Sequence, residues 1–151
     1  MLLTVSLIFF SIMLLLGING MTSTPVTVYE SVMDGEKLLG IKEVMKVATY
    51  ITLFFAIFQS VPVLIHHFAV ESLPLYLFLA VVLHAMVNIY DLGNRFRDMS
   101  EPVEETKTKL RNKALEFDLT KRGKVKYYGT YIIYMVLRLV IIFGLINILF
   151  F

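Results

Sequence analysis

Four apolar segments, each long enough to cross a lipid bilayer, limit the fold of this chain more than any other feature. They occupy about residues 2–18, 47–65, 73–92 and 127–151. A hydrocarbon core of about 30 Å is crossed by about 20 helical residues at about 1.5 Å per residue. Hydrophobic residues make up 58% of the chain, more than a soluble domain requires, and lipid-facing surface explains the excess. The sequence therefore predicts an all-α polytopic membrane protein with four transmembrane helices and a single membrane domain, residues 1–151.

The first segment also has the length of a secretory signal peptide. However, no Lys or Arg precedes Lys37, and the stretch that ends at Gly20 is not a small-x-small cleavage site. We therefore expect this segment to remain as a transmembrane helix.

Lys and Arg residues are concentrated in two of the segments that connect the predicted helices. Of the fourteen basic residues, three lie at 37–46, ten lie at 95–126, and Arg138 is the last. Because cytoplasmic loops of membrane proteins carry an excess of Lys and Arg, we expect the connections at about 19–46 and 93–126 to be cytoplasmic. Both termini are then non-cytoplasmic. This placement accounts for the positive charge, and no nucleic-acid partner is expected.

Local signals set the expected ends of the predicted helices. The first connection should run into a short amphipathic helix before the second span, which Pro62 interrupts near its far end. Residues 66–72 then form a tight connection, and Pro74 sits in the first turn of the third helix. Gly93 and Asn94 should end that helix. The charged segment that follows is expected to be solvated and partly helical.

Polar and ionisable side chains recur at helical spacing in the last two apolar segments. One set is His84, Asn88 and Asp91, and the other is Tyr127, Tyr131, Tyr134 and Arg138. Each set forms a single stripe on its helix. His84 and Arg138 lie about eleven residues into their helices, near the middle of the bilayer, where ionisable groups must be sheltered. Because consecutive helices are antiparallel, we expect the two stripes to face one another or a common polar crevice.

Three interpretations of these stripes remain open. They could serve helix packing, in which each polar contact contributes about 0.6 to 2 kcal/mol. They could instead contact a transmembrane segment of a partner, because Arg138 has no carboxylate at its own depth and Asp91 lies about 10 Å shallower. A proton or ion path is the third interpretation, although a cation at the midplane opposes cation flow.

Patterns typical of catalysis or metal binding do not stand out in the sequence. His66 and His67 are adjacent and point to different faces, and the nearby Glu71 does not complete a convincing metal site. There is no Cys, and there is no nucleophile with a positioned base, glycine-rich phosphate loop or pair of catalytic carboxylates. We therefore expect no metal, no cofactor and no enzymatic activity.

The second predicted cytoplasmic loop contains a candidate recognition motif for a cytosolic partner. The stretch from Glu116 to Thr120 places Phe117 among acids, and the residues of interest are Phe117, Asp118 and Thr120. The basic residues of this loop could also bind anionic lipid headgroups, but the interleaved acids weaken the field, and a role in topology explains the charge.

Several short motifs, together with the layout of the spans, resemble a known family. The motifs are Val28-Tyr29-Glu30 with Asp34, Asn88-Ile89-Tyr90, Phe117-Asp118 with Thr120, and Val125-Lys126. In these features the chain resembles the cornichon family of small cargo receptors for endoplasmic reticulum export. After Asp34 it lacks the family's Tyr-x-Asn-Pro, and its second loop is longer. The resemblance implies cargo binding through the spans, coat-adaptor binding near residues 117–120, and a location in the endoplasmic reticulum or Golgi.

The sequence as a whole favours a non-enzymatic membrane protein that binds other membrane proteins. A cornichon-like cargo receptor or auxiliary subunit is the specific version, in which the stripe residues contact a transmembrane client. A bacterial or phage exclusion or immunity protein of the inner membrane is one alternative, and a small transporter or channel subunit is another. The bilayer itself is the partner common to all three.

Overall fold

The computed structural model describes residues 1–21, 24–36 and 39–151, which form six α-helices. The helices are α1 (Leu2–Gly20), α2 (Pro25–Glu36), α3 (Ile41–Ala69), α4 (Leu75–Ser100), α5 (Val103–Leu119) and α6 (Lys121–Phe150). Four of them, α1, α3, α4 and α6, are long and apolar enough to cross a membrane. The all-α class and the four spanning helices are therefore confirmed, and the chain is an integral membrane protein. Lys37, the first cation of the predicted first loop, lies outside the described residues.

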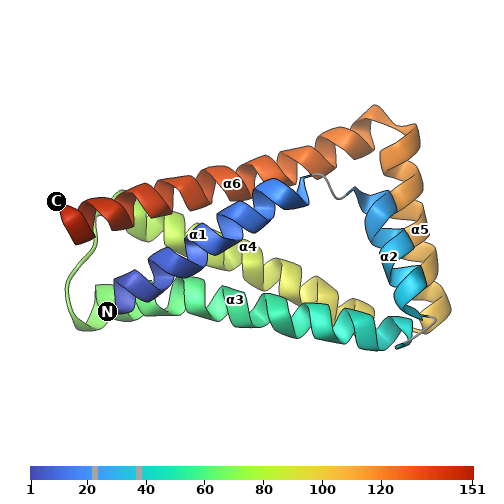
Figure 1. The fold of residues 1–151 in the computed structure, drawn as a ribbon, viewed down its shortest axis with the longest axis horizontal. Helices are drawn as coiled ribbons and strands as arrows, with labels where there is room; N and C mark the ends of the chain where they lie inside the picture. Colours follow the sequence, from blue (N-terminus) through green and yellow to red (C-terminus); the bar gives the residue numbers. More distant parts are fainter. Residues whose placement is uncertain (22–23, 37–38) are drawn as a thin grey trace.

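The four long helices form a bundle, and the two shorter helices cross one end of it. In Figure 1, α2 and α5 lie side by side, roughly perpendicular to the bundle, and α2 lies nearer to the spanning helices. The N- and C-termini lie together at the opposite end of the bundle. The charged segments are thus gathered at one end, and the uncharged termini at the other.

Helix α4 continues past Gly93 and Asn94, where the sequence had predicted its end. A glycine in a helix costs only about 1 kcal/mol relative to alanine, and local contacts offset this cost. Leu92 is buried, and Asp91 accepts a hydrogen bond from Arg95, one turn further on, at 2.9 Å. The helix ends at Ser100, because Pro102 forces the preceding residue out of the helical conformation.

Helix α3 is longer than the predicted second span at both ends. It begins directly after Gly40, whose φ of 80° favours glycine, and it continues past Pro62 through His66 and His67. The connection to α4 is therefore shorter than predicted. Pro74 caps α4 instead of lying within its first turn.

The predicted second loop consists almost entirely of helix. It comprises the end of α4, the whole of α5 and the start of α6. Thr106, Ala114 and Phe117 of α5 are buried, and α5 packs against α2 and α6. Apart from Thr106, Ala114, Phe117 and Gly123, the residues of this segment are exposed or half-exposed, so it is more helical than expected while most of its side chains reach solvent.

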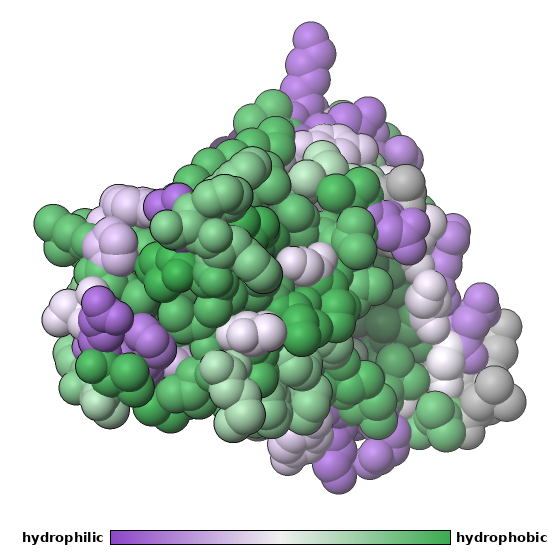
Figure 2. All heavy atoms as spheres, turned by 60° about the vertical axis from the view of Figure 1, so that its left-hand side comes forward, coloured by the Kyte–Doolittle hydropathy of each residue, from purple (hydrophilic) through white to green (hydrophobic). Residues whose placement is uncertain are grey.

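The apolar core of the bundle lies toward the end that carries the termini. It is formed by buried residues of four helices, among them Leu3 and Phe10 of α1, Val63 of α3, Leu77 and Val81 of α4, and Ile141 and Leu145 of α6. Many other large hydrophobic side chains of the spanning helices are exposed. Figure 2 shows this end of the molecule largely covered by hydrophobic residues, with hydrophilic ones at its margins. Such a surface is suited to lipid.

Candidate functional site

The interior of the bundle holds a group of polar residues that we name the interior polar cluster: His84 and Asn88 of α4, and Tyr134 and Arg138 of α6. His84 is 0% exposed and Arg138 is 7% exposed. The rings of His84 and Tyr134 meet edge to face, with their centroids 5.8 Å apart. The two predicted stripes therefore face one another at this level.

The Asn88 amide fixes the tautomer of His84. Asn88 Nδ2 lies 2.8 Å from the His84 carbonyl oxygen and 3.0 Å from His84 Nδ1. The carbonyl can only accept, so the atom facing it must be the amide nitrogen, and Nδ1 must then accept as well. A neutral His84 consequently carries its proton on Nε2. This N–H is buried and has no hydrogen-bond partner among the described residues.

Arg138 is held by α1, which the sequence analysis had not connected with it. Its Nη1 donates to the carbonyl oxygen of Met13 at 3.2 Å, and its guanidinium carbon lies 5.2 Å from the centre of the Tyr134 ring. Gly17 makes room for this side chain, because a Cβ there would lie 3.3 Å from Arg138 Nη1. Arg138 Nε, like His84 Nε2, is a buried donor without an acceptor in the described part of the chain.

The remaining residues of the predicted stripes lie outside this cluster. Tyr131 packs toward α1, since a Cβ at Gly20 would lie 3.6 Å from the Tyr131 ring. The Tyr127 ring lies tilted against the Tyr131 ring, with ring centroids 4.9 Å apart. Asp91 is 44% exposed and pairs with Arg95 of its own helix. Asp91 therefore does not neutralise Arg138.

Three further buried side chains of α1 and α3 have polar atoms without a hydrogen-bond partner among the described residues, and the sequence analysis missed them. Ser6, Gln59 and Ser60 are all buried, and neither the Gln59 amide nor the two hydroxyls has a hydrogen-bond partner among the described residues. Gln59 lies within the second apolar segment and could have been found by the argument used for His84. The two serines carry a weaker signal, because a serine in a helix can bond to its own backbone.

The predicted cytoplasmic motif forms the corner between α5 and α6. Phe117 is buried and packs edge to face on Tyr127, with ring centroids 5.3 Å apart. Thr120 caps α6 by accepting a hydrogen bond from the backbone N–H of Gly123 at 2.9 Å. Asp118 is exposed. Thr120 is exposed too, but its hydroxyl is engaged in the cap, so among the described residues Asp118 is the motif residue whose side chain remains available to a partner.

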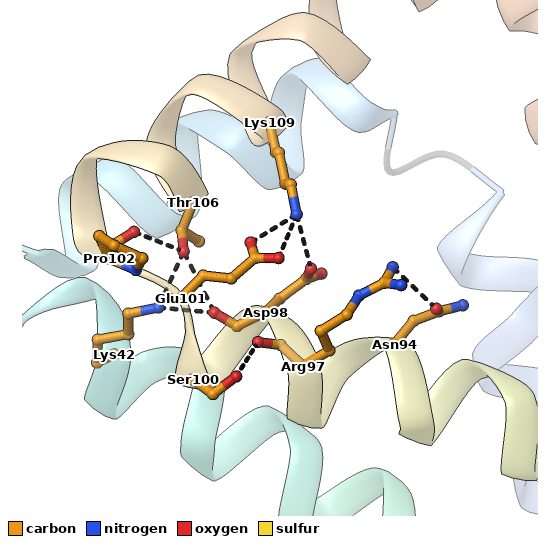
Figure 3. A network of polar contacts seen from close by, with 9 residues as sticks. All are labelled: Lys42, Asn94, Arg97, Asp98, Ser100, Glu101, Pro102, Thr106 and Lys109. Carbon is orange, nitrogen blue, oxygen red and sulfur yellow. Dashed lines mark hydrogen bonds and ion pairs between the residues drawn. The ribbon is translucent and has the colours of Figure 1, made fainter.

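A polar network joins α3, α4 and α5 at the end where α2 and α5 lie (Figure 3). Lys42 donates to the carbonyl oxygen of Asp98 at 2.7 Å and to Thr106 Oγ1 at 2.9 Å, so it satisfies the carboxyl end of α4. Lys109 lies 2.6 Å from Glu101 Oε2 and 3.7 Å from Asp98. The hydrogen bond to Glu101 raises the pKa of the Lys109 ammonium, and the negative charges of Glu101 and Asp98 act in the same direction.

The histidines at the other end of the molecule do not assemble a metal site. His67 Nδ1 accepts a hydrogen bond from the backbone N–H of Leu73 at 3.0 Å, which orders the turn into α4. His66 and Glu71 line an open pocket beside Pro74. Within the described ranges, no three His, Cys, Asp or Glu side chains are grouped so that they could hold a metal ion.

The fold and the site together define the class of this protein: an integral membrane protein of four spanning helices whose interior holds buried polar donors. Comparisons with family models, with curated proteins and with solved structures gave no match for this chain.

Proposed function

We propose that this chain is a non-enzymatic membrane protein that binds a transmembrane segment of other membrane proteins through the interior polar cluster. The observation that carries the proposal is the pair of unsatisfied donors, His84 Nε2 and Arg138 Nε. A buried donor without an acceptor costs about 1–3 kcal/mol, and more when it is charged. An acceptor supplied by a partner would recover this free energy.

Helix α1 is the element that would move to admit such a client. It covers Arg138 with Met13 and Gly17, and the Met13 carbonyl accepts a hydrogen bond from the Arg138 guanidinium. A client helix carrying a carboxylate or an amide oxygen could replace the Met13 carbonyl and reach both donors. Because no water competes in the hydrocarbon core, a single such contact can confer specificity.

A cornichon-like cargo receptor or auxiliary subunit is the specific form of this proposal. The resemblance of its short motifs supports it, and so does the gathering of Lys and Arg at the α2–α5 end, which favours a cytoplasmic position for that end. Both termini would then lie on the non-cytoplasmic side. The exposed Asp118 and Leu119 would be available to a cytosolic partner. The same contacts would serve an exclusion or immunity protein if the host membrane were a bacterial inner membrane.

A second candidate function, a small transporter or channel subunit, is favoured by the unsatisfied polar atoms of Ser6, Gln59 and Ser60. With those of the interior polar cluster, they provide polar atoms on all four spanning helices. Water that entered between the helices would find partners on each of them. Flux through proteoliposomes would test this function directly.

Photocrosslinking in native membranes tests the client-binding proposal. A photoreactive residue at Leu16, which is half-exposed and adjacent to Gly17, should capture a discrete membrane protein, and the Arg138→Leu substitution should abolish this capture. Met86 is exposed on α4 and, at about 100° per residue, points away from His84, so the same residue placed there is the matched control. Capture of lipid alone, or only of this chain's own helices, would refute the proposal.

A further inference from the structure

The first two turns of α6 carry four cations that have no partner among the described residues. They are Lys121, Arg122, Lys124 and Lys126. All four are exposed, and none forms a hydrogen bond or an ion pair through its side chain with any residue that the structure describes. We name these residues the α6 basic collar.

Several of the other charges at this end of the molecule form ion pairs. Arg95 pairs with Asp91, Lys107 with Glu104, and Lys109 with Glu101 and Asp98. The four acids of these pairs therefore neutralise cations of α4 and α5, and no acid of the described residues forms an ion pair with the collar.

The collar residues lie on the side of α6 that does not contact α5. Gly123 and Tyr127 face α5, since a Cβ at Gly123 would collide with the backbone of residues 116–117 and the Tyr127 ring packs on Phe117. Successive residues are separated by about 100° around a helix. The positions of the four cations then cover much of the remaining circumference.

Two large apolar side chains accompany the collar. Val125, at the centre of the cationic arc, is 72% exposed, and Leu119, just before α6, is 75% exposed. Exposed apolar groups among cations are typical of a surface that lies at the boundary between lipid headgroups and acyl chains.

The length of α6 places the collar near the headgroup layer. Its 30 residues extend for about 45 Å, whereas the hydrocarbon core is about 30 Å thick. If the apolar end at Phe150 reaches the opposite interface, about 15 Å at the start of α6 passes beyond the core. Lys124 and Lys126 then lie beside the phosphates, with the tyrosines at 127 and 128 at the level of an interfacial aromatic belt.

The presence of four cations at the start of α6 is not explained by a contribution to helix stability. Cations near the start of a helix are repelled by the positive end of its dipole, and the first turn of α6 contains no acid. An external anion between these side chains would remove that repulsion.

We propose that the α6 basic collar binds the phosphate of an anionic phospholipid in the leaflet next to α2 and α5. Phosphate oxygens would accept from Lys124 and Lys126, while Val125 would lie between them in the headgroup layer. This lipid site is independent of the interior polar cluster and of the proposed client.

Native mass spectrometry of the full chain tests the lipid site. The protein, solubilised in neutral detergent, would be mixed with equal amounts of dioleoylphosphatidylglycerol and dioleoylphosphatidylcholine, and the retained lipids counted. The Lys124→Gln/Lys126→Gln variant should lose preference for phosphatidylglycerol, by about fivefold for each cation removed. The Arg111→Gln/Lys113→Gln variant removes equal charge from exposed positions of α5 and is the matched control.

Each outcome of this experiment is decisive. Preferential retention of phosphatidylglycerol by the wild type and by the α5 control, but not by the collar variant, supports the site. Equal retention by the collar variant and the wild type would overturn it, as would no preference in the wild type. Displacement of the lipid by excess inorganic phosphate alone would show a simple anion site and would overturn the lipid assignment. Unfolding temperatures of both variants control for loss of fold.

Discussion

Replacing Gly123 by alanine should open the corner between α5 and α6. A Cβ at this position would lie 2.6 Å from the carbonyl carbon of Glu116 and 2.8 Å from the backbone nitrogen of Phe117. Backbone atoms cannot rotate away as a side chain can, so the two helices must separate. Separation pulls Phe117 away from Tyr127 and lengthens the hydrogen bond from Gly123 N–H to Thr120.

The magnitude follows from three contributions to the free energy of unfolding. Overpacking against a fixed neighbour costs about 1–3 kcal/mol, and loss of the Thr120 cap costs about 1 kcal/mol. The higher helix propensity of alanine offsets about 1 kcal/mol of this loss of stability. The net destabilisation is therefore about 1–3 kcal/mol.

Gly129 in the same helix provides the matched control. A Cβ there would have no atom of another element within 4 Å, so the Gly129→Ala variant should be stabilised by up to about 1 kcal/mol. Denaturant unfolding in one detergent, followed by circular dichroism, would measure both variants. Equal unfolding free energies for the two alanine variants would refute the close approach of α5 and α6.

Two further predictions concern the contacts between helices. The Lys109→Gln variant should unfold at a lower temperature than the wild type at neutral pH, and a thermal scan against pH should show the difference disappearing as pH rises through the Lys109 pKa. The reason is that a pKa raised in the folded state stabilises the fold only while the group is protonated; a difference that persisted at higher pH would contradict this. The Gly144→Leu variant should lose about 1–3 kcal/mol, because a Cβ there would lie 2.9 Å from Leu77 Cδ1. In a double-mutant cycle, the Leu77→Ala substitution should recover part of the stability that Gly144→Leu loses. Simple additivity of the two losses in unfolding free energy would argue against this contact.

The spanning helices could be predicted from the sequence because their signal is local. An apolar run of about 20 residues has few stable alternatives to a transmembrane helix. Their ends were less predictable, because α3, α4 and α6 continue past the apolar runs into charged segments. Composition marks where the hydrocarbon ends, and not where the helix ends. At Gly93, the pair of Asp91 and Arg95 sustains a helix that glycine alone would weaken.

The candidate site could be predicted only in part. Helical periodicity placed His84 and Arg138 on stripes, and the antiparallel order of α4 and α6 brought the stripes together. Nothing in the spacing shows that α1 would supply the Met13 carbonyl, because that contact depends on the room left by Gly17. The structural roles of Phe117 and Thr120 were equally hidden, since a buried face in a charged segment is too short to give a clear period.

The Arg138→Leu variant, measured in two ways on one preparation, tests the central claim most directly. The claim is that Arg138 is kept for a partner at the expense of stability. The unfolding free energy of the isolated protein should be unchanged or higher by about 1–4 kcal/mol, because a buried cation without a carboxylate is removed. Recovery of a membrane-protein partner from native membranes should be lost. If the variant has a lower unfolding free energy than the wild type, and the same partner is still isolated with it, the account is contradicted.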